Sequence, residues 1–445
     1  MRAAFSRISE SDRLRRAAKG APATFALKVG ATGATLLLNL LLARMLGVAA
    51  FGAYAYATTW ASFLAVPAIL GLDLLLLREV AAALTRREWS LLAGLLRFAH
   101  LVAAVVAVGL AILVSVAAYF LTGGPSTALM VFWLAMVTVP LVTLIRLNQA
   151  AMRGLDRVVV GQLPELAVRP ALVIVFVLAA YLVLGPRFDG VWAILCLLLA
   201  SAIALVVGAI QLILQLRAAV VAASPIYRIG VWFRSAGPLL LVGSIIVINR
   251  QIDIILVGAL MGLEAAGIYA VASRGAELIS FVLYAVNASL APRIASLYAS
   301  GDTAALERAV VGGARAATLF SAPLAVAFIL FGAQFLGLFG PGFAAGTSAL
   351  VILSVARVAD AFAGSVGMAL TMTGNERATA VGMGAAAAAN IALNLLLIPP
   401  WGMVGAATAS ATSVVMWNVI LATMVHRRLG IATTAWGNDR SRARP

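Results

Sequence analysis

The chain has 445 residues, of which 63% are hydrophobic and only 11% are charged. A soluble globular domain has about half apolar and about a quarter charged residues, so this composition excludes that class. The formal net charge of +16 would favour a nucleic-acid partner in a soluble protein, but here the positions of the charges explain it better.

The N-terminal segment, residues 1–23, is basic, and apolar sequence begins at Thr24. The first apolar segment is too long for the core of a signal peptide and lacks an evident small-residue cleavage site, so it indicates a retained first span. The single cysteine, Cys196, lies in the apolar run VWAILCLLLA. We therefore expect no disulfide within the chain, no metal site and no cofactor.

Twelve apolar segments follow in chain order, and each is long enough to cross a hydrocarbon core of about 30 Å as a helix. They lie near residues 24–46, 52–76, 91–120, 126–150, 159–184, 189–215, 234–260, 265–290, 309–333, 343–372, 376–398 and 401–426. Strands of a β-barrel alternate over about ten residues, whereas these runs are longer and apolar on all sides. The sequence therefore predicts an all-α membrane protein with about twelve transmembrane helices.

The basic residues support this count and give an orientation. Of the 32 Lys and Arg residues, only Arg44 and Arg187 fall in segments expected outside. Six more lie within spans, and the remaining 24 lie in the tails and in every second loop. Cytoplasmic loops carry an excess of Lys and Arg, so this distribution predicts that both termini are cytoplasmic. It also predicts attraction to anionic membrane lipid in place of nucleic acid.

The two halves of the chain repeat a short pattern. LGVAAFGAYAYA at 46–57 aligns without gaps on MGLEAAGIYAVA at 261–272. An even number of spans separates the copies, so the repeat is parallel and a transport path is expected between the halves. The predicted organisation is a basic cytoplasmic tail (1–23), a six-helix lobe (24–215), a cytoplasmic linker (216–233), a second six-helix lobe (234–426) and a second basic cytoplasmic tail (427–445).

Charged residues within the spans are the candidate functional residues, because a charge at the centre of a span costs about 2.5–3.5 kcal/mol by insertion scales. Several stand three or four apart on one helix and can reach each other. These pairs are Glu165 with Arg169, Arg250 with Asp253, Arg274 with Glu277, and Arg357 with Asp360. They indicate either a wet, basic cavity or structural pairing between and within helices.

Polar stripes on two spans favour the cavity, although small polar residues also hold helices together. One stripe holds Thr24, Lys28, Thr32, Thr35 and Asn39, and the other holds Tyr269, Ser273, Glu277, Ser280, Tyr284 and Asn287. Each stripe lies within an arc of about 80° and is expected to face protein or water. The predicted cavity residues are Lys28, Asn39, Arg250, Asp253, Arg274, Glu277, Arg357 and Asp360, and the predicted proton- or ion-coupling residues are Asp253, Asp360 and Glu165.

Four segments of the sequence together resemble the polysaccharide-biosynthesis, or oligosaccharide flippase, family of the multidrug/oligosaccharidyl-lipid/polysaccharide exporter superfamily. They are LGVAAFGAYAYA leading to GLDLLLLREVA, AAMRGLDR at 150–157, RQIDIILVGALMGLEAAGIYAVASR at 250–274 and LNLLLIPPWGMVGAATASATS at 393–413. The resemblance implies two six-helix lobes around a central cavity that work by alternating access. It also implies an undecaprenyl-diphosphate-type lipid-linked oligosaccharide, moved from the cytoplasmic to the outer leaflet of the bacterial inner membrane for surface polysaccharide synthesis. The polysaccharide-assembly machinery is a further expected partner.

Two alternatives remain open from the sequence, and two other classes lack a feature that they need. An ion-coupled multidrug exporter would have the same architecture, but a site for cationic drugs favours carboxylates and aromatic rings over basic residues. A lipid II flippase of the related group usually has two additional spans. An envelope polymerase or ligase would need long outer loops, and a nucleotide-driven pump would need a GxxxxGK[ST] motif. We find neither feature, so we expect a transporter that is not an enzyme.

Overall fold

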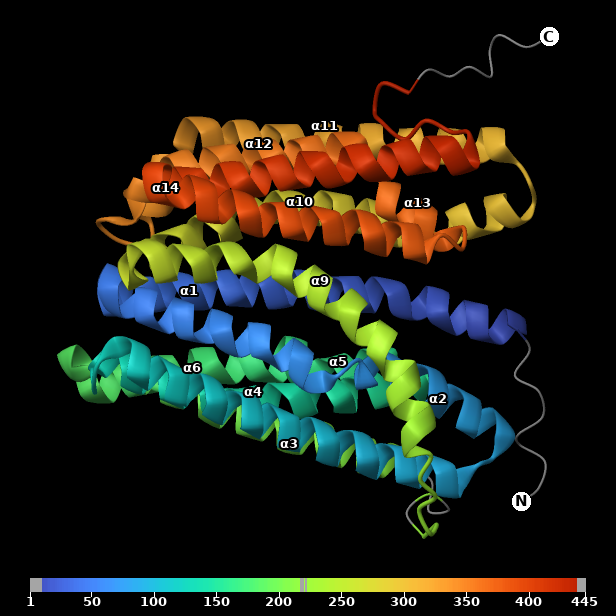
Figure 1. The fold of residues 1–445 in the computed structure, drawn as a ribbon, viewed down its shortest axis with the longest axis horizontal. Coiled ribbons are helices and arrows are strands. Elements are labelled where there is room, and N and C mark those ends of the chain that lie inside the picture. The colour runs from blue at the N-terminus through green and yellow to red at the C-terminus, as the bar shows by residue number, and fades with distance from the viewer. Residues whose placement is uncertain (1–9, 217–219, 221, 438–445) are drawn as a thin grey trace. The chain divides into compact units, whose positions relative to one another are not determined.

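The computed structural model describes residues 10–216, 220 and 222–437, and the predicted tails extend beyond them. Within these residues the chain forms helices and no strand, which confirms the all-α class (Figure 1). The first part of the chain contains α1 (Glu10–Ile69), α2 (Leu72–Arg86), α3 (Trp89–Thr122), α4 (Thr127–Gly154), α5 (Val158–Leu163), the π-helix η1 (Pro164–Val168), α6 (Arg169–Leu184), the 3₁₀-helix η2 (Gly185–Arg187) and α7 (Gly190–Gln215). The second part contains α9 (Ile229–Met261), α10 (Leu263–Ala299), α11 (Thr303–Gly337), the 3₁₀-helix η3 (Phe343–Gly346), α12 (Thr347–Ala363), α13 (Val366–Met372) and α14 (Glu376–Leu429).

Ten helices within the described ranges are long and apolar enough to cross a membrane. Three of them contain a residue with non-helical dihedral angles: Gly47 in α1, Phe331 in α11 and Gly402 in α14. From Ala23 to Ile69, α1 has 47 apolar-rich residues, and α14 has 54, so each is long enough for two crossings. This arrangement is compatible with twelve spans, and the exact number stays a prediction.

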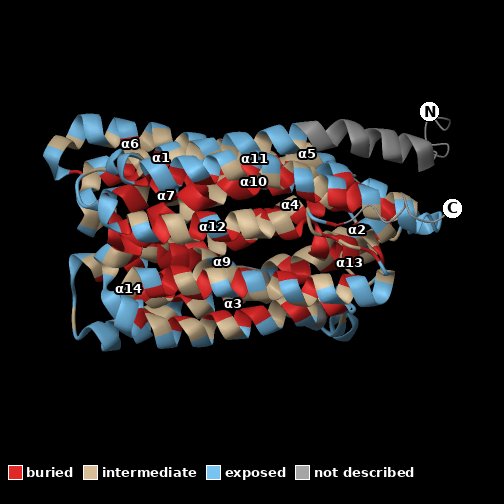
Figure 2. Cartoon of the chain, turned by 90° about the horizontal axis from the view of Figure 1, so that it is seen from above, coloured by how far each residue is buried: buried red, intermediate tan, exposed pale blue. Residues whose placement is uncertain are grey.

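Exposed apolar side chains identify surfaces that need a lipid environment. On α3, Leu101, Val105 and Ile112 are 67%, 63% and 59% exposed. Exposed positions also follow one side of α6 and α11 (Figure 2). A soluble protein rarely exposes contiguous apolar stripes of this length, whereas lipid tails solvate them without penalty. The protein is therefore a multi-pass membrane protein.

The chain packs as two compact units. The first comprises Met1–Leu38 and Leu64–Leu241, and the second comprises Asn39–Phe63 and Val242–Pro445. Residues 39–63 precede most of the first unit in the sequence yet pack with the second. The lobe boundaries predicted from the sequence stay a prediction.

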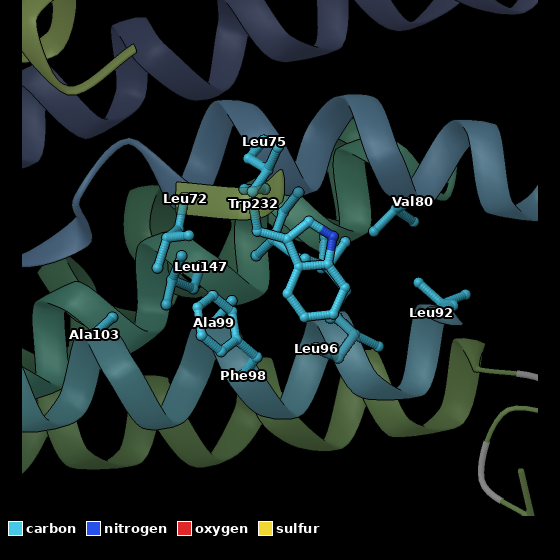
Figure 3. Packing of buried hydrophobic residues seen from close by; sticks show 14 of the residues in the cluster. Leu72, Leu75, Val80, Leu92, Leu96, Phe98, Ala99, Ala103, Leu147 and Trp232 are labelled. Atoms are coloured by element: carbon cyan, nitrogen blue, oxygen red, sulfur yellow. The ribbon is translucent and has the colours of Figure 1, made fainter. Parts of the chain in front are cut away.

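The core of the first unit is built by α2, α3 and α4 around Trp232 from the start of α9 (Figure 3). Trp232 is 2% exposed, and its ring centroid lies 5.1 Å from that of Phe98. The predicted linker contributes as well, because the Ile226 amide donates to the Ser90 carbonyl oxygen at 3.0 Å. Gly94 leaves the space in which the Ile226 carbonyl packs on α3. The described part of this linker is therefore an integral part of the first unit.

In the second unit, α10, α11, α12 and α14 pack side by side. Two interruptions shape this bundle. The chain leaves α12 at Gly364, whose φ of 79° is a left-handed conformation, and continues as the short helix α13. At Gly402, α14 folds back on itself, so that Ser413 Oγ donates to the Ala386 carbonyl oxygen at 2.8 Å. The predicted single span at 343–372 is therefore two helical segments.

The two copies of the sequence repeat have the same backbone conformation at equivalent positions. Gly47 has φ 70° and ψ 177°, and Gly262, which is 215 residues later, has φ 95° and ψ 171°. This region of dihedral space is accessible almost only to glycine. Each glycine separates two helical segments, as the alignment predicts. The structure thus supports a repeat that includes its turn geometry.

Candidate functional site

Asp253 lies in a buried polar network of the second unit. The side chain is 7% exposed and is carried by α9. Asn394 Nδ2 donates to Asp253 Oδ1 at 2.8 Å, and the hydroxyls of Ser410 and Tyr269 donate to Oδ2. Three neutral donors therefore satisfy a carboxylate that would otherwise be costly to bury.

A second carboxylate, Asp360 on α12, has its own set of donors. Asn418 Nδ2 and Trp417 Nε1 donate to Asp360 Oδ1 at 2.8 and 3.3 Å. Arg357, one turn earlier on the same helix, lies close enough for its charge to act on both Asp253 and Asp360. Its Nε atom is buried and has no hydrogen-bond partner within the described residues. The cluster thus combines two satisfied carboxylates with a guanidinium that retains hydrogen-bonding capacity.

The fold-back of α14 at Gly402 assembles this cluster. Asn390 and Asn394 lie before the kink, whereas Ser410 and Asn418 lie after it. The spacing of four residues places the two asparagines on one face, and Asn394 Nδ2 also contacts Asn390 Oδ1 at 2.6 Å. Both arms of α14 therefore provide polar groups for carboxylates on α9 and α12.

Arg250 forms an ion pair between helices. Its Nη2 donates to Glu277 Oε1 at 2.5 Å and to the Tyr284 hydroxyl at 3.2 Å. The predicted pairing with Asp253 on the same helix is therefore wrong. Asp253 is already satisfied by donors on α10 and α14, whereas Glu277 stands on the neighbouring α10. The side chains of Arg250 and Glu277 are 53% and 40% exposed, so this pair opens to a surface and is not packed in the core.

The polar stripe on α10 faces protein along much of its length, as expected. Tyr269 is fully buried and contacts Asp253, while Asn287 Oδ1 accepts a hydrogen bond from Ser365. Glu277 and Tyr284 contact Arg250 between these two points. The remaining predicted residue of this helix, Arg274, is half-buried and lies within range of the charge of Glu277. The second unit thus contains seven of the eight predicted cavity residues: Asn39, Arg250, Asp253, Arg274, Glu277, Arg357 and Asp360.

The first unit has a smaller ionic site. Glu165 accepts from Arg146 Nε at 3.4 Å, so it has an ion-pair partner on α4. Glu165 belongs to the π-helical turn η1, a type of irregularity that is frequent at functional sites. Of the other predicted residues, Lys28 in this unit is exposed, whereas Asn39 in the second unit is 2% exposed.

Sequence reasoning missed the amide and hydroxyl residues of α14 and the role of Arg146. Asn390, Asn394, Ser410 and Asn418 are all less than one-tenth exposed. The four-residue spacing of the two asparagines in an alanine-rich stretch was the available signal. Among the described residues, no group of three or more His, Cys, Asp or Glu side chains could hold a metal ion.

Comparison with known proteins places these features in context. A family model described as polysaccharide biosynthesis protein matches residues 17–298, which is more than half of the chain. The probable flippase AglR of Haloferax volcanii is 30% identical over 173 residues. This match covers 38% of the chain, and the chain spans only 36% of the length of that relative.

Several solved transporters share the fold. An inward-facing multidrug resistance MATE family transporter of the MOP superfamily has a TM-score of 0.76 at 16% identity, with 90% of this chain and 94% of that chain covered. The lipid II flippase MurJ, in an inward closed conformation, has a TM-score of 0.66 at 13% identity, with coverages of 91% and 86%. A MOP superfamily transporter from Pyrococcus furiosus, described by a binding pocket of reverse polarity, has a TM-score of 0.65 at 14% identity, with coverages of 93% and 96%.

Proposed function

Because this chain belongs to the polysaccharide biosynthesis protein family, we propose that it is a flippase for lipid-linked oligosaccharides. The proposed cargo is an oligosaccharide on an undecaprenyl-diphosphate-type carrier. It would move from the cytoplasmic to the outer leaflet of the bacterial inner membrane, with both termini of the protein in the cytoplasm. The observation that carries this proposal is Arg357, a basic group within a span that has an unpartnered buried nitrogen.

The chemistry of the second unit fits such a cargo. A diphosphate is recognised best by guanidinium groups, which offer a planar fork of donors to phosphate oxygens. Arg357 supplies that group, and the exposed side of Arg250 with Tyr284 supplies further donors for phosphate or sugar hydroxyls. A hydrophobic carrier chain can remain in the lipid beside the apolar outer faces of the helices. The proposed site thus divides recognition between a charged headgroup and a lipid tail.

Asp253 and Asp360 are the proposed coupling groups of this unit. With one guanidinium and two carboxylates, the cluster has a surplus negative charge that a proton or a monovalent cation neutralises. The hydroxyl oxygens of Ser410 and Tyr269 contact Asp253, and Asn390 Oδ1 contacts the same Asn394 amide; oxygen atoms are ligands of the type that hard cations prefer. Glu165, paired with Arg146, is the corresponding candidate in the first unit. We assign no metal or organic cofactor to the protein.

Alternating access links these groups in one cycle. Before cargo arrives, Asp253 and Asp360 compensate the charge of Arg357. An incoming diphosphate competes for the guanidinium and leaves the carboxylates with less compensation, which favours uptake of a proton or cation. A change in charge at this cluster then favours one access state over the other, because α9, α12 and α14 all contribute to it.

A multidrug exporter of the same superfamily is the alternative that the fold favours, since a MATE transporter has the highest of the three TM-scores given above. Its cargo would be a cation, and the intramembrane Arg250, Arg274 and Arg357 oppose cation binding electrostatically. A lipid II flippase is a second alternative, and it shares the diphosphate chemistry. The multidrug exporter differs from the proposed flippase in its cargo and not in its architecture.

Reconstitution separates the candidates. Purified protein in vesicles should move a fluorescent polyprenyl-diphosphate sugar between leaflets, measured by quenching with a membrane-impermeant reductant. Removal of the protein from cells should accumulate lipid-linked glycan on the cytoplasmic leaflet without reducing its synthesis. Drug efflux by the same preparation without movement of the lipid probe would favour the exporter. Movement of lipid II alone would favour the third candidate.

A further inference from the structure

The last described residues of the chain, 430–437, form a strap that binds to the second unit. Ile431 is 2% exposed and belongs to the apolar cluster that includes Leu306 and Val310 of α11 and Val366 of α13. Thr433 is 4% exposed, whereas the Trp436 ring is exposed and stands edge-on against Phe362 at 5.2 Å. The strap is therefore anchored by buried residues in its first half and reaches the surface at Trp436.

Polar contacts fix the strap to α11. The Ala432 amide donates to Glu307 Oε1 at 2.9 Å. Arg315 donates through Nε to the Ala435 carbonyl oxygen and through Nη2 to the Gly437 carbonyl oxygen, both at 3.0 Å. The Arg315 guanidinium thus holds two backbone carbonyl groups of the strap, two residues apart, and this contact does not depend on the strap's side chains.

The strap also supplies a hydrogen-bond donor to a backbone carbonyl group at the break between α12 and α13. In a continuous helix the Phe362 carbonyl oxygen would accept from the amide of Val366, but that amide donates to Gly364 at 2.9 Å. The Ala435 amide donates to Phe362 in its place, at 3.0 Å. A Cβ atom at Gly364 would lie 2.8 Å from the Thr433 carbonyl oxygen and 2.7 Å from Ala314 Cβ. Strap, break and α11 thus meet at one point, where only glycine fits.

The break that the strap contacts lies next to the proposed charge cluster. The amide of Gly364 donates to the carbonyl oxygen of Asp360, and Arg357 lies one turn earlier, so the break directly follows the proposed charge cluster. In transporters, interrupted helices commonly form the binding site, and alternating access moves one part of the protein against another around that site. A segment that ties the end of α12 to α11 controls whether that movement can occur.

From this arrangement we infer that the strap is a latch on the α12–α13 hinge, which must leave α11 in each transport cycle. The inference rests on the proposed transport function and adds a regulatory contact to the same site. While the strap is bound, the Phe362 carbonyl is satisfied and α12 is held against α11. When α12 tilts, Ala435 loses its acceptor and Arg315 releases the two carbonyls to water.

A reversible crosslink tests the latch. A Cβ atom at Gly437 would lie 2.7 Å from Val311 Cγ2, so cysteines at these positions are within reach of a disulfide, whose Cβ atoms are about 3.5–4.5 Å apart. The variant combines Val311→Cys and Gly437→Cys with Cys196→Ala, which removes the single native cysteine. The two matched single-cysteine variants, treated with the same oxidant, are the controls.

We expect the oxidised double variant to move the fluorescent polyprenyl-diphosphate sugar at least about tenfold more slowly than the reduced protein, with recovery after reduction. Equal rates in crosslinked and reduced protein would overturn the latch. If the reduced protein moves no probe, the proposed function fails. The latch is then tested by comparing hydrogen exchange at the amides of Gly364 and Val366 between the crosslinked and the reduced protein. Exchange at least about tenfold slower in the crosslinked protein supports it, and unchanged exchange overturns it.

Discussion

Gly52 and Gly267 occupy equivalent positions in the two copies of the sequence repeat, and they lie against each other. A Cβ atom at Gly267 would be 2.6 Å from Gly52 Cα, and one at Gly52 would collide with the Leu263 carbonyl. A Cβ atom at Gly267 would also be 3.4 Å from the carbonyl oxygen of Val48, the repeat equivalent of Leu263. The contact is therefore close to two-fold symmetric, as expected when equivalent turns of a repeated unit meet. Arg44 extends it by donating to the Leu338 carbonyl oxygen at 2.6 Å.

Gly52→Ala should disrupt this contact. Overpacking of this kind costs about 1–3 kcal/mol, which is enough to shift a two-state equilibrium by about tenfold. We expect a cysteine introduced at the buried Ala270 to react faster with an impermeant thiol reagent in this variant than in the Gly52 parent, both in a Cys196→Ala background. Gly33→Ala, in the segment of α1 that precedes Gly47, is the control, because a Cβ atom there has no neighbour within 4 Å. Equal reactivity in all three proteins would show that the close contact of Gly52 with Gly267 does not limit access to position 270.

The spans were predictable from the sequence because their apolar length far exceeds that of a core helix in a soluble protein. The interruptions were not. The run FAGSVG around Gly364 has the same small, apolar character as the helices on either side, so only packing against Ala314 and Thr433 shows that the chain leaves the helix there. The π-helical turn at Pro164–Val168 likewise has no apolar period that sets it apart.

The candidate site was predictable in its charges and not in its partners. Insertion cost alone identified Arg250, Asp253, Arg357 and Asp360. Spacing on one helix then gave Asp253 as the partner of Arg250, but the α9–α10 interface provides Glu277 at 2.5 Å. A choice between partners on the same helix and on a neighbouring helix depends on tertiary packing, which one sequence does not contain.

Removal of one partner of the Arg250–Glu277 pair should affect transport more than removal of one partner of an ion pair that is exposed to water. Arg250→Gln leaves Glu277 without its ion-pair partner within a span, and Glu277→Gln leaves Arg250 likewise. We therefore expect each single variant to reduce transport several-fold and the double variant to be less impaired than the worse single one. Arg78→Gln at the exposed Arg78–Glu79 pair is the control and should change transport by less than about twofold. Additive effects in the double variant would contradict a direct coupling of the two charges.

Cysteine labelling tests the predicted orientation. In a Cys196→Ala background, Ser224→Cys should be protected from an impermeant reagent added from the periplasmic side, whereas Thr122→Cys should react. Both positions are exposed, so a difference in labelling reports the side of the membrane and not burial. The basic residues around the 217–233 linker motivate this expectation. Strong periplasmic labelling at Ser224 would be incompatible with twelve spans and a cytoplasmic N-terminus.

Arg357 provides the sharpest test of the proposed charge cluster. Arg357 is carried by α12, its Nε atom is buried, and its charge acts on both Asp253 and Asp360. Arg357→Ala should abolish movement of the polyprenyl-diphosphate probe. Arg357→Lys should retain part of it, because an ammonium still attracts phosphate but cannot bind it through a planar fork.

Asp360→Asn serves as the companion variant, since it removes a carboxylate from the cluster and leaves Arg357 in place. It should slow cycling more than it weakens probe binding, because the amide keeps the shape of the side chain and still accepts from Asn418. Rates of probe movement and binding of the probe to detergent-solubilised protein separate these two effects. If Arg357→Ala, inserted at the normal level, transports at the rate of the unmodified protein, the cluster serves only to hold α9, α12 and α14 together.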